Sequence, residues 1–60
     1  MGQQVELRSI KAGGKFRLVG AAAEYVRGEY DRSSRSYYAK EIGYSDVYKF
    51  PAAAVVEVAA

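Results

Sequence analysis

The chain alternates short runs of strand-forming residues with turn signals, and it contains no apolar stripe at helical spacing. The run KFRLV, residues 15–19, alternates cleanly between side chains that would face a core and side chains that would face solvent. The stretches KAGGK, DRSS and GYSD separate such runs, and Gly, Asp and Ser favour tight turns. This pattern predicts an all-β protein.

The spacing of the runs predicts a small SH3-like barrel formed as one domain over residues 1–60. We expect five strands, at about 4–8, 15–19, 24–30, 35–42 and 46–50, with a segment at 54–58 that closes the sheet. Pro51 is expected to end a strand because it lacks a backbone N–H, and a short 3-10 turn should precede the last strand. A barrel of the oligonucleotide-binding type ranks second, because it needs longer strands and usually a helix.

The expected core consists of the larger apolar residues on the inward face of each run. In EYVRGEY, we expect Val26 and Tyr30 to face inward and Tyr25 and Arg27 to face outward. A glycine within this run, Gly28, indicates a bulge or a close backbone approach. The residues expected to be buried are Leu7, Phe16, Leu18, Val26, Tyr30, Ile42, Val47, Phe50, Val56 and Val58.

Length and composition limit how such a chain can be stabilised. A domain of 60 residues buries only about 60% of the surface that its unfolded chain exposes, and its stability margin is thin. It contains neither Cys nor His, which excludes disulfides and the usual zinc ligands. Small chains without such links often gain stability by association, so we expect a homo-oligomer. We also expect a soluble, cytoplasmic protein without membrane contact, since no run is long enough to span a bilayer and no signal peptide is recognisable.

Catalytic motifs are not recognisable in the sequence. Without His and Cys, the roles of base and nucleophile would fall to carboxylates, Lys, Tyr or Ser. Ser33 and Ser34 lie in an expected turn with no base nearby in the sequence. The stretch AGGK departs from a phosphate loop, because Phe16 stands where Ser or Thr is needed. We therefore expect no enzyme, no catalytic residue, no metal and no cofactor.

The stretch RGEYDRSSRSYY, residues 27–38, concentrates Arg and Tyr around a predicted turn. Guanidinium groups contact phosphates and tyrosine rings stack on bases, at about 1–3 kcal/mol per stacked base. Residues 8–40 hold eight Lys or Arg against three carboxylates, and the isoelectric point near 9.0 is compatible with a nucleic-acid partner. We expect a non-enzymatic module that binds DNA or RNA. The expected contact residues are Lys15, Arg17, Arg27, Arg32, Arg35, Tyr37 and Lys40.

The stretch YVRGEYDRSSRSYY resembles short uncharacterised phage and prophage proteins that carry an R-G-E-Y-x-R-S-x-K-x-Y core. The matching residues are Arg27, Gly28, Glu29, Tyr30, Arg32, Ser33 and Tyr37, with Arg35 in place of Lys. With Ile10, Lys11, Gly13, Phe16 and Leu18, the likeness covers about residues 10–40. Beyond it, Ile42, Gly43 and Tyr44 stand where such proteins continue with Asp-Asp-Val-Asn. The resemblance implies a phage-like accessory protein and no known activity.

The end VYKFPAAAV resembles the closing strand of the plasmid-borne type II dihydrofolate reductases, which are SH3-like barrels that tetramerise around a pore. The matching residues are Val47, Phe50 in place of Tyr, Pro51, Ala53 and Ala54. The pore chemistry of those enzymes sits on a Gln-Ile pair, where this chain has Tyr48 and Lys49. The resemblance supports a barrel and implies no reductase activity.

Two alternatives to nucleic-acid binding stay open. In a chain without Trp, its six Tyr and two Phe must supply most of the bulky core, and Glu24, Glu29 and Asp31 suggest cross-strand ion pairs. One alternative is therefore a structural or self-assembling barrel without a ligand, natural or simplified by design. The other is a phage accessory protein that binds a host protein, since exposed Tyr and Arg are also favoured at protein interfaces.

Overall fold

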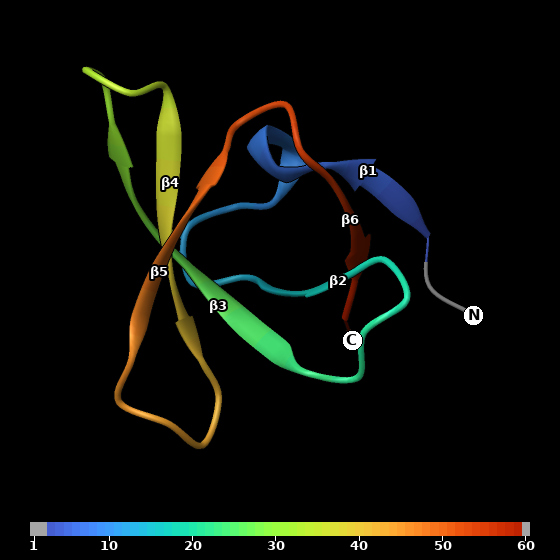
Figure 1. Ribbon diagram of the computed structural model, residues 1–60. Helices are drawn as coiled ribbons and strands as arrows, with labels where there is room; N and C mark the ends of the chain where they lie inside the picture. Colours follow the sequence, from blue (N-terminus) through green and yellow to red (C-terminus); the bar gives the residue numbers. More distant parts are fainter. Residues whose placement is uncertain (1–2, 60) are drawn as a thin grey trace.

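A computed structural model describes residues 3–59 of the chain, which form one antiparallel sheet of six strands (Figure 1). The strands are β1 (Gln4–Glu6), β2 (Lys15–Leu18), β3 (Glu24–Asp31), β4 (Ser36–Glu41), β5 (Val47–Pro51) and β6 (Val55–Val58). A 3-10 turn, η1 (Leu7–Ser9), follows β1, and residues 3–59 contain no α-helix. The prediction of an all-β protein is confirmed. The described part of the chain also contains no helix with the length and apolar character needed to cross a membrane.

The sheet is open and has one strand more than expected. Its order is β1-β6-β2-β3-β4-β5, so β1 and β5 are edges that do not pair with each other. The extra strand arises at Pro51: β5 pairs with β4, whereas β6 inserts between β1 and β2. Between them lies a single turn closed by the Ala54 N–H on the Pro51 carbonyl at 3.0 Å. The 3-10 turn was expected before the last strand, and this position is wrong. The 3-10 segment is η1, which follows β1 and overlaps the range where the first strand was expected.

Backbone hydrogen bonds connect η1 to the segment between β5 and β6, which is distant in sequence. The Leu7 N–H donates to the Ala54 carbonyl at 2.8 Å, and the Arg8 N–H donates to the Ala52 carbonyl at 3.0 Å. Figure 1 shows η1 beside the link from β5 to β6. The sheet therefore curls until η1, which follows the edge strand β1, approaches the end of β5, the strand at the other edge.

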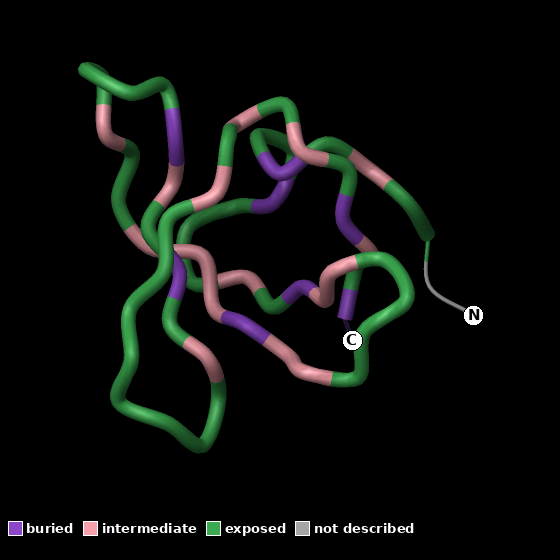
Figure 2. Tube along the Cα trace, viewed as in Figure 1, coloured by how far each residue is buried: buried purple, intermediate pink, exposed green. Residues whose placement is uncertain are grey.

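The core is built from aromatic and aliphatic side chains on the inner face of the curled sheet. Figure 2 marks the buried positions along the chain. Leu7, Phe16 and Val56 are fully buried, as expected. Phe16 stacks on Tyr25 with ring centroids 5.6 Å apart and meets Phe50 edge-on at 6.1 Å. Leu18, Val26 and Phe50 are half-buried. The buried residues that were not expected are Ile10, Tyr25, Ser36, Ala39 and Ala59.

The expected burial of four residues, Tyr30, Ile42, Val47 and Val58, is wrong, since all four are exposed. Tyr30 lies near the end of the β3–β4 hairpin, beyond the core. The phase expected for the start of β3 is also wrong: Tyr25 pairs with Phe16, and directly opposed residues share a face, so Tyr25 rather than Val26 faces the core. Val47 pairs with Lys40 on the outer face, and Ile42 lies in the turn after β4. Val58 does face inward opposite Phe16, but it ends β6 near the margin of the sheet.

The expected bulge in β3 is confirmed. The register of β3 against β4 shifts between Arg27 and Tyr30, so that Arg27 pairs with Ala39 and Tyr30 with Tyr37. A Cβ atom on Gly28 would lie 3.1 Å from the Tyr38 carbonyl oxygen, which is tighter than ordinary contact. Glycine therefore permits the close approach of the two strands. Because of the bulge, Tyr30 projects on the inner side toward the end of the hairpin, beyond the core.

Candidate nucleic-acid interface

The residues expected to contact nucleic acid do not lie on one surface. The strand register divides them into three groups. Lys15, Arg17 and Lys40 lie on the outer face of the sheet, Arg27 and Tyr37 on the inner face, and Arg32 and Arg35 in the turn between β3 and β4. Each group has different surroundings.

Two exposed lysines form a row on the outer face. Lys15 and Lys40 both lie directly opposite Val26, one on β2 and one on β4, so all three side chains leave the same side of the sheet. Two strand spacings separate the lysines, which is about 10 Å. No carboxylate of residues 3–59 lies within ion-pair distance of either ammonium group. These lysines are available to an anionic ligand.

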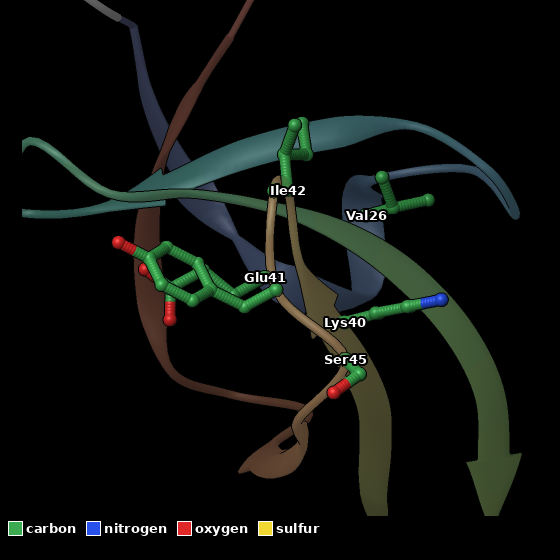
Figure 3. A pocket seen from close by; sticks show the side chains of 7 residues that line it. Val26, Lys40, Glu41, Ile42 and Ser45 are labelled. Carbon is green, nitrogen blue, oxygen red and sulfur yellow. The ribbon is translucent and has the colours of Figure 1, made fainter.

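Tyr38 extends this row along β4 and was not among the expected contact residues. Alternation puts it on the same face as Lys40, and 41% of its surface is exposed. A shallow pocket lies beside its ring, lined in part by Val26, Gly28, Tyr38 and Lys40. A second pocket adjoins Lys40 under the turn after β4, and Figure 3 shows the side chains of Val26 and Lys40 extending to the same side of it. The sequence could have indicated Tyr38 as a contact residue: it lies two residues from Lys40 on β4, so an outward Lys40 implies an outward Tyr38.

Arg17 is engaged by carboxylates on both neighbouring strands. Its guanidinium lies 3.6 Å from Glu24 on β3 and 3.9 Å from Glu57 on β6. The expected cross-strand ion pairing is therefore confirmed for Arg17 and Glu24. This pairing offsets the charge of Arg17 and makes it a weaker candidate for phosphate contact than Lys15.

Arg27 and Tyr37 pack against each other on the inner face. The guanidinium carbon of Arg27 lies 4.1 Å from the centroid of the Tyr37 ring, a cation–π arrangement. The Nε atom of Arg27 is buried and has no hydrogen-bond partner among residues 3–59. Tyr37 is half-buried and its ring lies 4.9 Å from that of Tyr30. This pair faces away from the outer lysines and contributes to packing.

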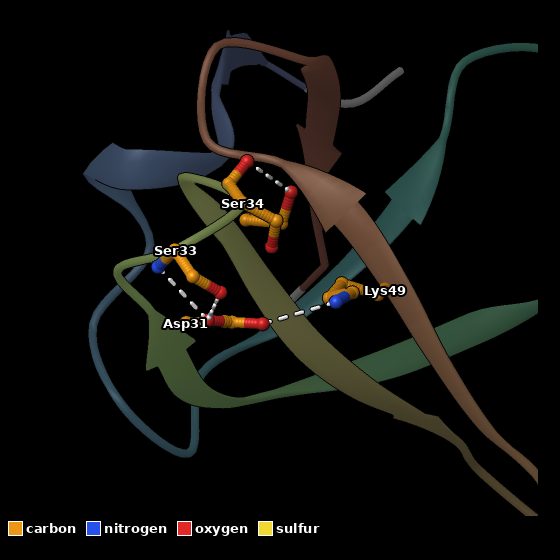
Figure 4. A network of polar contacts seen from close by, with 5 residues as sticks. Asp31, Ser33, Ser34 and Lys49 are labelled. Carbon is orange, nitrogen blue, oxygen red and sulfur yellow. Dashed lines mark hydrogen bonds and ion pairs between the residues drawn. The ribbon is translucent and has the colours of Figure 1, made fainter.

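The turn between β3 and β4 is held by a network centred on Asp31 (Figure 4). One carboxylate oxygen accepts from the Ser33 backbone N–H at 3.0 Å and from the Ser33 hydroxyl at 2.7 Å. The other accepts from the Lys49 ammonium at 3.0 Å. The hydrogen bond from the Ser33 hydroxyl, and next to it the one from Lys49, hold the pKa of Asp31 well below its usual range. The hydrogen bond to Asp31 in turn raises the pKa of Lys49. Ser33 thus acts as a turn former, as expected.

Replacing Asp31 by Asn should lower stability in a pH-dependent way. Since folding depresses the pKa of Asp31, its contribution is fully present above the unfolded pKa, near 3.8, and is lost as pH falls toward the folded pKa. The melting temperature of Asp31→Asn should therefore lie below that of the parent at pH 7, with a smaller gap at pH 2. Thermal melts at both values test this. Asp46→Asn is a matched control, because Asp46 forms no ion pair within residues 3–59.

Arg32 and Arg35 are both exposed in this turn, and no carboxylate of the described residues pairs with either. Arg35 has φ +53°, a left-handed conformation that non-glycine residues adopt infrequently. Its carbonyl accepts a hydrogen bond from the Ala52 N–H at 3.0 Å, which fixes the turn against the end of β5. The turn thus presents two arginines on a constrained backbone.

Comparison with protein-family models, with curated proteins and with solved structures gives no match. Within residues 3–59, no group of three or more acidic, His or Cys side chains is arranged to hold a metal ion. A functional assignment therefore rests on the surfaces of the chain itself.

Proposed function

We propose that this chain is a non-enzymatic binding module whose ligand is single-stranded nucleic acid. The observation that carries the proposal is a set of four exposed cations on β2, on β4 and in the turn between β3 and β4, together with the exposed ring of Tyr38, over which the Lys49 ammonium lies 5.4 Å from the centroid. These cations are Lys15, Arg32, Arg35 and Lys40, and no carboxylate of residues 3–59 pairs with them. Cations that contact phosphates and aromatic rings that stack on bases are the two elements of sequence-tolerant single-strand binding.

The dimensions of β4 suit this ligand. Residues 35–40 span about 17 Å at 3.3–3.4 Å per residue, with Tyr38 between the arginines at one end and Lys40 at the other. A strand that follows β4 can place phosphates at both ends and a base on the Tyr38 ring. We infer a single strand because paired and stacked bases of a duplex do not present a face to a side chain.

We further propose that the curled sheet is a partly open SH3-like barrel. The single turn at Pro51–Ala54 supports this proposal, because β5 and β6 can then be counted as one strand with an interruption. The hydrogen bonds from the Leu7 and Arg8 N–H groups to the Ala54 and Ala52 carbonyls also support it. Counted in this way, the sheet has five strands. Curling shields its edges, which otherwise invite pairing with other chains.

The proposal is tested by fluorescence anisotropy with labelled single-stranded and double-stranded oligonucleotides of equal length at low salt. We expect the single strand to bind and the duplex to bind more weakly, because only the single strand can use Tyr38. The absence of binding to either at low salt would overturn the proposal.

Self-association is a second candidate, favoured by apolar side chains around the β4–β5 turn. Tyr44 and Val47 are more than 60% exposed, and Ile42 and Tyr48 lie nearby with about 40% exposed. Exposed apolar groups gathered in one region mark interaction sites, and a domain of this size gains stability by association. We therefore propose a homo-oligomer through this surface. Sedimentation equilibrium should show association that persists at moderate salt, and a monomer at high micromolar concentration would contradict it.

A further inference from the structure

A pocket at the end of the β3–β4 hairpin lies on the opposite side of the turn from the Asp31 network and outside the row formed by Lys15, Lys40 and Tyr38. It is lined by Arg8, Tyr30, Ser34, Arg35 and the Pro51–Ala53 turn. Its volume is about 420 Å³, which lies within the range of about 300–1,000 Å³ typical of small-ligand sites. Arg35 also belongs to the four cations of the proposed interface, whereas Arg8 and Tyr30 do not, so the pocket adjoins that interface and extends it.

The two arginines are brought together by the backbone of one residue. The Arg8 N–H donates to the Ala52 carbonyl, and the Ala52 N–H donates to the Arg35 carbonyl, both at 3.0 Å. Residues 8 and 35 are thereby fixed on either side of a single peptide segment. The small side chains of Ala52 and Ala53 leave the space between them open.

The pocket carries an excess of positive charge. The Nε atom of Arg8 lies 2.9 Å from a carboxylate oxygen of Glu6, so this guanidinium is held in place at one edge and keeps its terminal amino groups. Arg35 has no carboxylate partner within residues 3–59. The pocket therefore has two positive charges on its lining and one neighbouring negative charge, and this balance favours an anionic ligand.

Tyr30 gives the pocket an aromatic wall. Its surface is 43% exposed, and its ring rests against Tyr37 with centroids 4.9 Å apart. The two rings are tilted by 52° to each other, and Arg27 lies over the ring of Tyr37, so packed side chains support Tyr30 on one side. A ring supported in this way can accept a base on its exposed side.

We propose that this pocket binds the terminal phosphate of a single strand together with the adjoining base. A terminal phosphate monoester carries about −1.5 to −2 charges, more than an internal phosphate, and two guanidiniums match that charge. Arg8 and Arg35 donate to the phosphate oxygens, Ser34 offers a hydroxyl, and Tyr30 stacks on the base. This inference rests on the proposed function, and it adds a preference for strand ends that bear phosphate.

The experiment compares one labelled single strand in three forms: with a 5′-phosphate, with a 3′-phosphate, and with hydroxyl groups at both ends. We expect one of the phosphorylated forms to bind about tenfold more tightly than the hydroxyl form, because charged hydrogen bonds are gained. Arg35→Gln and Arg8→Gln should each reduce this preference to about onefold. Arg32→Gln is the control within the same turn. As one of the four cations of the interface, Arg32 should lower the affinity of all three forms alike when replaced, and because it does not line the pocket, the ratio between the forms should stay that of the parent.

The outcomes separate the two proposals. Equal affinity of all three forms would overturn the pocket and leave the nucleic-acid assignment standing. A preference that survives both Arg35→Gln and Arg8→Gln would also overturn it, by locating the phosphate elsewhere. If no form binds at low salt, the proposed function fails and the pocket assignment fails with it.

Discussion

Replacing Phe16 by Ala is expected to unfold the domain. The Phe16 ring is fully buried at the centre of the inner face, between Tyr25 and Phe50. Truncation of a buried Phe costs about 3–5 kcal/mol, whereas small domains lie near the lower end of a stability range of about 5–15 kcal/mol. Circular dichroism and a urea titration at 25 °C should show a largely unfolded chain, or a much lower midpoint.

Val55→Ala provides the control for Phe16→Ala. Val55 also lies in a strand, β6, but its side chain is 54% exposed, so its truncation should cost at most about 1 kcal/mol. A Phe16→Ala protein with the midpoint of the parent would show that the inner face described here is not the core.

The contrast between β2 and β3 explains how much of the fold the sequence could predict. In β2 the polar residues Lys15 and Arg17 flank Phe16, so only one phase buries the apolar side chains and the prediction is confirmed. In β3 both phases carry bulky residues, Tyr25 on one and Val26 on the other, so alternation alone cannot choose between them. Pairing of Tyr25 with Phe16 decides the phase, and this contact depends on the register with another strand.

The candidate site was predictable to a similar extent. Lys15 and Lys40 were expected to be exposed on strands, and the register adds that Val26 joins them in one row. Arg27 and Arg35 were both expected to line the contact, but Arg27 pairs with Ala39 on the inner face and Arg35 lies in the turn. Arg8 could not be found from local sequence, because long-range bonds to Ala52 bring it to the hairpin.

A Lys15→Gln, Lys40→Gln double variant should halve the salt dependence of single-strand binding. If the four unpaired cations each neutralise one phosphate, the logarithm of affinity should fall with slope about −2.8 against the logarithm of salt concentration, or about 50-fold between 50 and 200 mM. With two contacts removed, the slope should be about −1.4, a loss of about sevenfold over the same range. Anisotropy titrations at four salt concentrations measure both slopes.

Two further variants identify which part of the surface carries each effect. Arg17→Gln removes from the same face one positive charge that Glu24 and Glu57 already offset, and should keep the slope of the parent. Tyr38→Ala should weaken binding by about 1–3 kcal/mol without changing the slope, because stacking on a base releases no counterions. A double variant with the parent slope would exclude Lys15 and Lys40 from phosphate contact. A slope near zero for the parent would exclude phosphate contacts by all four cations, since such contacts release counterions.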